Sequence, residues 1–264
     1  MLKKVLLSIT ISASLFASSA EMSKISPDEA IKMLKEGNDR FIEQKKANPN
    51  SDKVRIMEIS KGQKPFVTIN GCSDSRVPPE IVFDQGLGDI FTVRTAGNVS
   101  ATDQIGTIEY GTEHLGTRLV VVLGHTKCGA VTAVAKGDHV HGNIPALVSS
   151  IVPPVTKVKD AHAGEHVDKW LNEAIKENTY ASIANILKKS DIVRELVMNG
   201  KVKIVAAIYD MDSGKVEFLG EHPQQIKLLA CVEAKKIAAK KIAEQGKQNN
   251  VKTKQSKPKA EASH

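Results

Sequence analysis

The sequence predicts an α/β protein with a central, mostly parallel sheet of four strands plus an antiparallel edge strand, flanked by helices. Three observations support this fold class. Of the 264 residues, 41% are apolar and 25% are charged, which is the composition of a globular domain with a sizeable core. Short runs rich in Val and Ile alternate with helical stretches, as is typical of parallel strands buried on both faces. No internal repeat is present, so one domain over residues 21–245 is expected.

The first twenty residues have the three parts of a secretory signal peptide. Lys3 and Lys4 precede an apolar stretch from Val5 to Phe16, and small residues follow as far as Ala20. This stretch is too short to span a bilayer. We therefore expect cleavage after Ala20, a periplasmic or secreted protein, and no integral membrane segment after cleavage. The alternative is a buried or membrane-anchoring N-terminal helix.

An N-terminal helical arm is expected to begin at residue 26. Ser26 suits the N-cap, Pro27 suits the first helical position, and Glu29 completes a capping box. Apolar residues then recur at helical spacing as far as about residue 45. The arm is therefore expected to be amphipathic.

Short apolar runs define the expected strands. The four parallel strands are expected at 66–70, 90–93, 119–123 and 202–209. A turn at residues 211–214 leads into the edge strand, expected at 215–219. The longer helices after the third strand are expected at 165–188, 191–198 and 224–244.

The net charge of +7 lies mostly at the ends of the chain. Residues 233–264 contain nine lysines and three acidic residues, so the body is close to neutral. This distribution gives no reason to expect the body to bind nucleic acid. The composition of residues 246–264 predicts a disordered basic tail. Such a tail is usually only solvated, and a specific anionic partner is the alternative.

The three cysteines would first suggest a disulfide and one free thiol in an exported protein. Cys72 and Cys128 are the plausible pair, but the residues around them favour metal binding. Cys231 lies on the last expected helix, where we expect a small buried apolar residue rather than a reactive thiol.

The strongest functional signal follows two of the expected strands. Cys72 comes after strand 66–70, and His125 and Cys128 come after strand 119–123. Functional groups of a parallel sheet gather beyond the carboxyl ends of its strands, so two thiols and one imidazole should converge. These groups suit zinc, and three protein ligands leave a fourth position for water. The structural alternative is two buried thiols and a satisfied core histidine.

The surrounding residues resemble the two signature motifs of the β-class carbonic anhydrases. The matching stretches are Cys72-Ser73-Asp74-Ser75-Arg76 and Gly124-His125-Thr126-Lys127-Cys128-Gly129. The resemblance covers roughly residues 63–219. It implies the family's fold, one zinc ion per subunit on Cys72, His125 and Cys128, and reversible hydration of carbon dioxide to bicarbonate and a proton through zinc-bound hydroxide.

The resemblance also implies that Asp74 pairs with Arg76. Two thiolates cancel the charge of zinc, so its water should ionise less readily than at a site of three imidazoles. Arg76 would keep Asp74 ionised and directed so that it accepts a hydrogen bond from the hydroxide. A simple structural ion pair is the alternative.

Some family members have a closed, inactive state in which the aspartate itself binds zinc. In that state Asp74 would be a fourth metal ligand. Members that switch through a bicarbonate pocket carry tryptophan three residues before the first cysteine, where this chain has Ile69. We therefore expect the open, water-bearing form, although Arg94 resembles another part of that pocket.

The substrate pocket is also expected from the resemblance. Gln63 resembles a glutamine that donates to a substrate oxygen, often across a dimer interface. Phe91 and Tyr110 resemble the aromatic wall of the carbon dioxide pocket, and Gly129 is expected beside it. Gln63 and the arm together imply a homodimer or a dimer of dimers. Without the family, Gln63 would be an exposed loop amide and the two aromatic residues would be core residues.

The chain departs from the family pattern at Thr95, which stands where the family usually has asparagine, so different local hydrogen bonding is expected there. Gly97 is expected to provide backbone room. His139 and His141 would suit a proton relay or a separate metal pair, but surface histidines are common.

Two rival functions remain open at this point. The first is a hydrolase of carbon disulfide or carbonyl sulfide on the same fold, because a fold does not choose among linear substrates. The second is a noncatalytic zinc or redox protein, with a closed site or a disulfide between Cys72 and Cys128.

Overall fold

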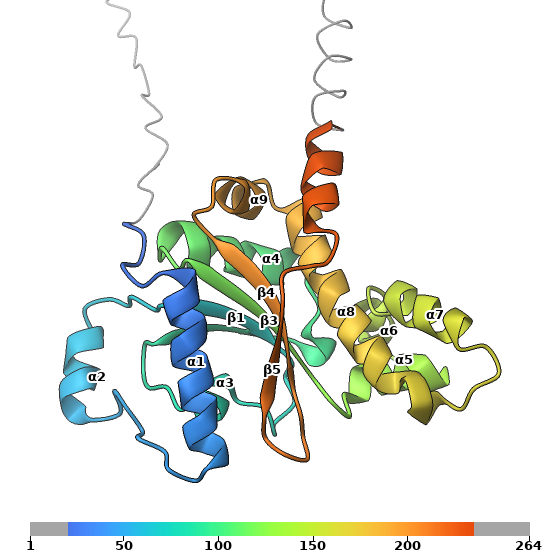
Figure 1. Ribbon diagram of the computed structural model, residues 1–264, viewed down its shortest axis with the longest axis horizontal. Coiled ribbons are helices and arrows are strands. Elements are labelled where there is room, and N and C mark those ends of the chain that lie inside the picture. Colours follow the sequence, from blue (N-terminus) through green and yellow to red (C-terminus); the bar gives the residue numbers. More distant parts are fainter. Residues whose placement is uncertain (1–20, 235–264) are drawn as a thin grey trace, which may run out of the picture.

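A five-stranded sheet lies at the centre of the computed structural model, which describes residues 21–234 (Figure 1). The strand order is β2-β1-β3-β4-β5. The strands are β1 (Val67–Gly71), β2 (Ile90–Arg94), β3 (Leu119–His125), β4 (Lys203–Tyr209) and β5 (Val216–Gly220). The first four are parallel and β5 is antiparallel to β4. The expected sheet is confirmed, with strand boundaries displaced by one or two residues.

Helices cover both faces of the sheet. In chain order they are α1 (Pro27–Ile42), α2 (Lys53–Ile59), α3 (Pro79–Val82), the 3-10 turn η1 (Ala96–Asn98), α4 (Thr102–Glu109), the π-helical turn η2 (Tyr110–His114), α5 (Gly129–Lys136), α6 (Ile144–Val148), α7 (Val152–Ala161), α8 (Val167–Lys189) and α9 (Asp191–Met198). Helix α1 crosses one face and α8 runs along the other (Figure 1).

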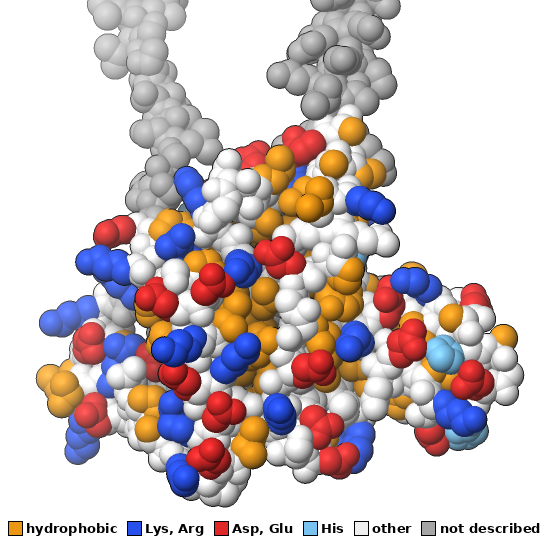
Figure 2. All heavy atoms as spheres, viewed as in Figure 1, with side chains coloured by type: hydrophobic (Ala, Val, Ile, Leu, Met, Phe, Trp, Pro, Cys, Tyr) orange, Lys and Arg blue, Asp and Glu red, His pale blue; other side chains and the backbone are white. Residues whose placement is uncertain are grey.

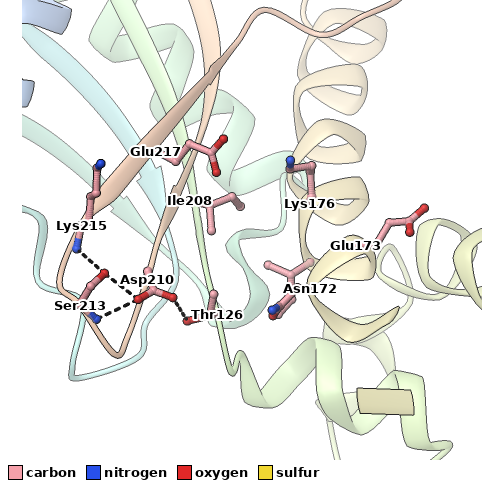
Figure 3. A pocket seen from close by; sticks show the side chains of 10 residues that line it. Thr126, Asn172, Glu173, Lys176, Ile208, Asp210, Ser213, Lys215 and Glu217 are labelled. Carbon is pink, nitrogen blue, oxygen red and sulfur yellow. Dashed lines mark hydrogen bonds between the residues drawn. The ribbon is translucent and has the colours of Figure 1, made fainter. Parts of the chain in front are cut away.

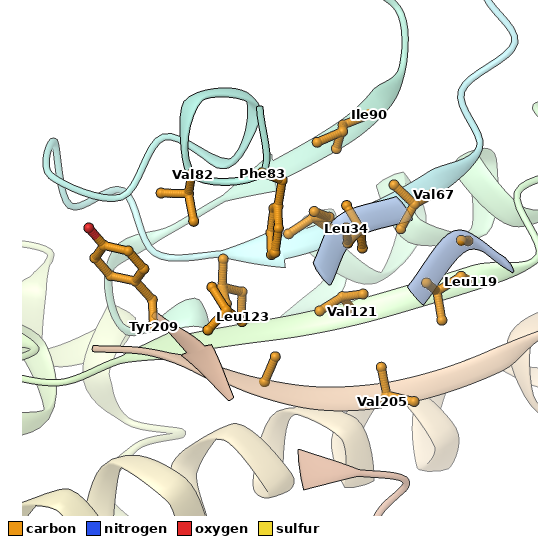
Figure 4. Close-up of a cluster of buried hydrophobic side chains, with 14 of the residues drawn as sticks. Leu34, Val67, Val82, Phe83, Ile90, Leu119, Val121, Leu123, Val205 and Tyr209 are labelled. Atoms are coloured by element: carbon orange, nitrogen blue, oxygen red, sulfur yellow. The ribbon is translucent and has the colours of Figure 1, made fainter. Parts of the chain in front are cut away.

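Strand β3 is buried over its whole length, and its alternate residues belong to two different cores. Val121 packs in the cluster that contains Leu34 of α1 (Figure 4). Val122 packs in the cluster that contains Ile183 of α8. Burial on both faces is the physical reason for a continuous Val-rich run in place of an alternating pattern.

The helical arm begins as its sequence predicts. Ser26 Oγ accepts a hydrogen bond from the Glu29 backbone N–H at 3.2 Å, and Glu29 Oε2 accepts one from the Ser26 N–H at 2.8 Å. This capping box satisfies two backbone donors that have no partner within the helix. The arm is thus fixed at its start, and its buried residues include Ala30 and Leu34.

The expectation that Cys231 is buried is wrong, because its side chain is exposed. Residues 225–234 are helical (Figure 1), and this helix contacts the body through Leu229 and through an ion pair between Glu233 and Arg194. Ile226 on the same helix is 84% exposed. Residues 1–20 and 235–264 lie outside the described residues, and with them the expected signal peptide, the end of the last helix and the basic tail.

Basic and acidic side chains are interspersed over the visible face of the body (Figure 2), in agreement with its nearly neutral charge. Among residues 21–234, no helix combines the length and the apolar character needed to cross a bilayer.

Candidate metal centre

Three buried side chains meet beyond the carboxyl ends of two neighbouring strands. Cys72 directly follows β1, His125 is the last residue of β3, and Cys128 is the N-cap of α5. Because β1 and β3 are paired in parallel, their ends bring these residues together. One ligand atom from each residue lies within 4.8 Å of the others. Within the described residues this is the one cluster of three or more potential metal ligands at such distances.

The orientation of His125 leaves one ring nitrogen available. Its Nδ1 lies 2.9 Å from the carbonyl oxygen of Thr126, so Nδ1 carries the proton and donates it to that oxygen. The Nε2 atom is buried and makes no hydrogen bond to any group in residues 21–234. A buried polar atom without a partner is costly. A metal ion would supply the missing partner, since neutral imidazole is a common zinc ligand.

The two thiols also fit a cation. A hydrogen bond from Cys128, opposed by burial, is the main cause that lowers the pKa of Cys72 to about 4. The backbone N–H of Gly97 also donates to Cys72 Sγ at 3.3 Å. The nearby Cys72 sulfur and burial raise the pKa of Cys128. The two sulfur atoms lie within 4.8 Å of each other, so two thiolates here need a positive charge between them. Zinc binds cysteine as the thiolate.

Asp74 stands beside these ligand atoms and is held by Arg76. Arg76 Nε and Nη2 donate to Asp74 Oδ1 and Oδ2 at 2.9 and 2.7 Å. These hydrogen bonds, opposed by burial, hold the pKa of Asp74 at about 2. Asp74 Oδ2 lies 3.9 Å from His125 Nε2. The expected ion pair is therefore present, and both oxygens of the carboxylate are engaged by Arg76.

Arg94 and Gly97 brace the loop that carries Cys72. Arg94 Nε donates to the Cys72 carbonyl at 3.0 Å, and Nη2 donates to the Asp74 carbonyl at 2.7 Å. Sequence reasoning related Arg94 only to a side pocket and missed this contact. The position of Arg94 at the carboxyl end of β2, the strand next to β1, could have predicted this contact.

The expectation that Gly97 provides backbone room is confirmed. Its φ is +72°, and a Cβ atom there would lie 2.5 Å from Ile151 Cδ1. Asn178 of α8 donates to the Gly97 carbonyl at 2.9 Å. Helix α8 thus fixes the turn whose N–H group reaches the Cys72 sulfur.

The expected substrate residues are divided between two places. Gly129 is the first residue of α5 and directly follows Cys128. Gln63 precedes β1, whereas Cys72 follows it, and the strand alone separates these positions by about 15 Å. Phe91 in β2 is paired with Thr68 near the start of β1.

The two aromatic residues expected to line the substrate pocket lie next to each other. The ring centroids of Phe91 and Tyr110 lie 6.0 Å apart, and Tyr110 is 48% exposed. Gly111 allows the π-helical turn to approach the sheet, because a Cβ atom there would lie 2.4 Å from Thr68 Oγ1. One chain therefore presents these aromatic rings at its surface, away from its own cysteines.

The two histidines after α5 form a pair on the surface. His139 and His141 are exposed, and their ring centroids lie 4.4 Å apart. Val140 between them packs against the hydrophobic cluster that contains Cys72 and Cys128. Neither histidine is among the converging ligands.

The chain is similar to known proteins in both sequence and fold. Residues 67–216 match the family described as carbonic anhydrase. Carbonic anhydrase 2 of Mycobacterium tuberculosis is 36% identical over 198 residues, which are 74% of this chain and 93% of that protein.

Solved structures with this fold include two fungal ones. The β-carbonic anhydrase CafA of Aspergillus fumigatus has a TM-score of 0.62 at 27% identity, with coverage of 68% of this chain and 86% of that chain. A tetrameric β-carbonic anhydrase of Sordaria macrospora has a TM-score of 0.55 at 22% identity, with coverage of 62% and 85%. The second likeness supports the fold alone.

Proposed function

Because the chain belongs to the β-class of the carbonic anhydrase family, we propose that it hydrates carbon dioxide reversibly at one zinc ion held by Cys72, His125 and Cys128. The observation that carries this proposal is the convergence of two sulfur atoms and one imidazole within 4.8 Å, with His125 Nε2 buried and without a hydrogen-bond partner in the described chain. A zinc ion bound there would lower the pKa of a water molecule and so supply a hydroxide nucleophile in the neutral to alkaline range.

In this proposal, Asp74 orients the nucleophile. Its carboxylate would accept a hydrogen bond from the metal-activated water or hydroxide and so would direct an oxygen lone pair toward the carbon of the substrate. Arg76 keeps Asp74 ionised, because its bidentate contact favours the charged form of the carboxyl group. The same contact holds Asp74 away from the ligand set, which favours the open arrangement.

We further propose that the site is completed by a second copy of the chain. Gln63, Phe91 and Tyr110 lie toward the amino end of the sheet, whereas the cysteines lie at its carboxyl end. Gln63 of a partner would donate to a substrate oxygen, and the aromatic pair would provide an apolar wall for an uncharged substrate. A homodimer or a dimer of dimers would satisfy this requirement.

The location of the enzyme is proposed from its sequence. A cleavable signal over residues 1–20, with the cut after Ala20, would place residues 21–245 as a single domain in the periplasm or outside the cell. The nearly neutral body supports a small-molecule substrate rather than a nucleic acid.

The test is carbon dioxide hydration by the wild type and by Cys128→Ser, with zinc measured in both. The wild type is expected to contain one zinc ion per chain, and its turnover should rise from neutral to alkaline pH as water ionises. The variant should lose both zinc and turnover. A wild type without zinc, or a turnover independent of pH, would contradict the proposal. Parallel assays with carbon disulfide and carbonyl sulfide identify the preferred substrate.

A further inference from the structure

Thr126 connects the candidate ligand His125 to the end of β4. Its carbonyl oxygen accepts the hydrogen bond from His125 Nδ1 at 2.9 Å. Its backbone N–H donates to the Tyr209 carbonyl at 2.9 Å. Its Oγ1 accepts from the Met211 N–H at 2.9 Å, and its hydroxyl faces Asp210 Oδ2 at 3.5 Å (Figure 3). The group that orients the imidazole is therefore itself fixed from a second strand.

The turn that receives Thr126 is closely bonded. Asp210 Oδ1 accepts from Ser213 N at 2.8 Å and from Ser213 Oγ at 2.7 Å (Figure 3). The Gly214 N–H donates to the Asp210 carbonyl at 2.8 Å. An ion pair between Lys127 and Asp212 joins the same loop to the same turn. The turn is thus a defined anchor for the ligand loop.

From these contacts we infer that Thr126 is a positioning residue for the metal centre, and that Asp210 anchors it. This inference rests on the proposed zinc function. The carbonyl of Thr126 selects the His125 tautomer with Nε2 free, and the Oγ1 contacts hold that carbonyl in place. Partners of this kind, which orient a ligand without touching the metal, set both metal affinity and ligand basicity.

The hydroxyl is the part of Thr126 that carries the inference. Valine has nearly the same shape and keeps the backbone contact to Tyr209, but it has no acceptor for the Met211 N–H and no donor for Asp210. Serine retains both functions. Thr126→Val and Thr126→Ser therefore separate the hydrogen bonds from the volume of the side chain.

A residue that lines the same groove as Thr126 provides a matched control. Thr126 and Asp210 line a hollow of about 740 Å³ between α8 and the β4–β5 hairpin (Figure 3). Glu217 on β5 lines the same groove and has no contact to the ligand loop among the bonds described above. Glu217→Gln changes the charge of the groove without changing the Thr126 contacts.

The experiment measures the zinc affinity of the purified holoprotein by competition with a chelator, together with its unfolding temperature and the pH profile of its turnover. Thr126→Val should bind zinc about tenfold or more weakly and show a displaced pH profile. Thr126→Ser and Glu217→Gln should match the wild type. Equal zinc affinity in Thr126→Val and the wild type, or equal losses in the Val and Ser variants, would overturn the inference.

A second variant covers the case in which Thr126→Val does not fold. Asp210→Asn keeps a similar shape and weakens the acceptor, so it should lower zinc affinity in the same direction by a smaller factor. An unchanged zinc affinity in Asp210→Asn would then overturn the inference. A wild-type protein that binds no zinc would instead overturn the proposed function, so the two failures are distinguishable.

Discussion

The two ends of β1 differ in how much of the proposed active site a single chain provides. At the carboxyl end, Cys72 meets His125 and Cys128, and Asp74 is already oriented by Arg76. At the amino end, Gln63 has none of these ligand residues beside it. This difference underlies the proposal that one chain holds the metal ion and that a second copy completes the substrate site.

Among the variants that keep Cys72, His125 and Cys128, Asp74→Asn should have the largest effect on turnover. The amide keeps the shape but removes the charged acceptor, so carbon dioxide hydration should fall by about 10²- to 10³-fold. The zinc content should stay at the wild-type value, because the three ligands are intact. Stopped-flow hydration and metal analysis measure the two quantities. If Asp74→Asn retained full turnover, the assigned role of this carboxylate would be incorrect.

Mixed dimers test whether the second copy is needed. Gln63→Ala should lower turnover by about 10²-fold with full zinc content, and Cys128→Ser should be inactive. In a mixed dimer, one site combines an intact metal centre with an intact Gln63. After subunits are unfolded and reassembled together at equal amounts, about a quarter of the wild-type sites should be complete. A mixture that only averages the separate activities would place Gln63 in the same chain as its zinc.

Gly97→Ala should destabilise the protein at the carboxyl end of β1, where Gly97 contacts Cys72. The new Cβ would lie 2.5 Å from Ile151 Cδ1 at a φ of +72°, so both a clash and a strained backbone are introduced. We expect a loss of about 3 kcal/mol in the free energy of unfolding, measured by chemical denaturation. Gly137→Ala is the matched control, since its φ is also +72° but nothing lies within 4 Å of the new atom. Equal losses in both variants would show that the clash is unimportant.

Asp84 should make the amino-terminal region sensitive to acid. Burial alone raises the pKa of Asp84, but hydrogen bonds from Arg40 and from the N–H groups of Ala47 and Asn48 outweigh it and leave the pKa below its ordinary value. Because the folded-state pKa is lower than the unfolded value of about 3.9, this stabilisation is present above about pH 4 and is lost as pH falls through the folded-state pKa.

Asp84→Asn therefore should lower the free energy of unfolding at neutral pH by about 2 kcal/mol, and its stability should fall less than that of the wild type on acidification. Denaturation curves at several pH values measure both effects. Parallel losses in the wild type and Asp84→Asn at low pH would contradict this account. The carboxylate fixes the segment between α1 and α2, which leads to Gln63, so the variant also tests how that end is held.

The sheet and the convergence of Cys72, His125 and Cys128 were predictable because they follow from local pattern and from the strand order. A run such as Leu119 to Leu123 has few alternatives to a doubly buried strand. The parallel order then requires Cys72 and His125 to lie at the same edge. The capping box at Ser26 is likewise complete within four residues. Local pattern and topology together therefore located the candidate site.

Other features depend on contacts that no local pattern records. The contact between Thr126 and Asp210 joins residues 84 positions apart, and Arg94 reaches the Cys72 loop from another strand. The π-helical turn at Tyr110 follows α4 without a break, so no turn residue or change of pattern in the sequence marks where it begins. Cys231 was expected in a core, but its side chain is exposed on the last described helix.

The central claim is that catalysis depends on a metal ion held by Cys72, His125 and Cys128. Its most direct test is stopped-flow hydration by the wild-type protein after chelation and dialysis, with folding checked by circular dichroism and zinc then added back in steps. Turnover should disappear with the metal and return in full at one zinc ion per chain. Full turnover by folded protein that contains no metal would contradict the claim.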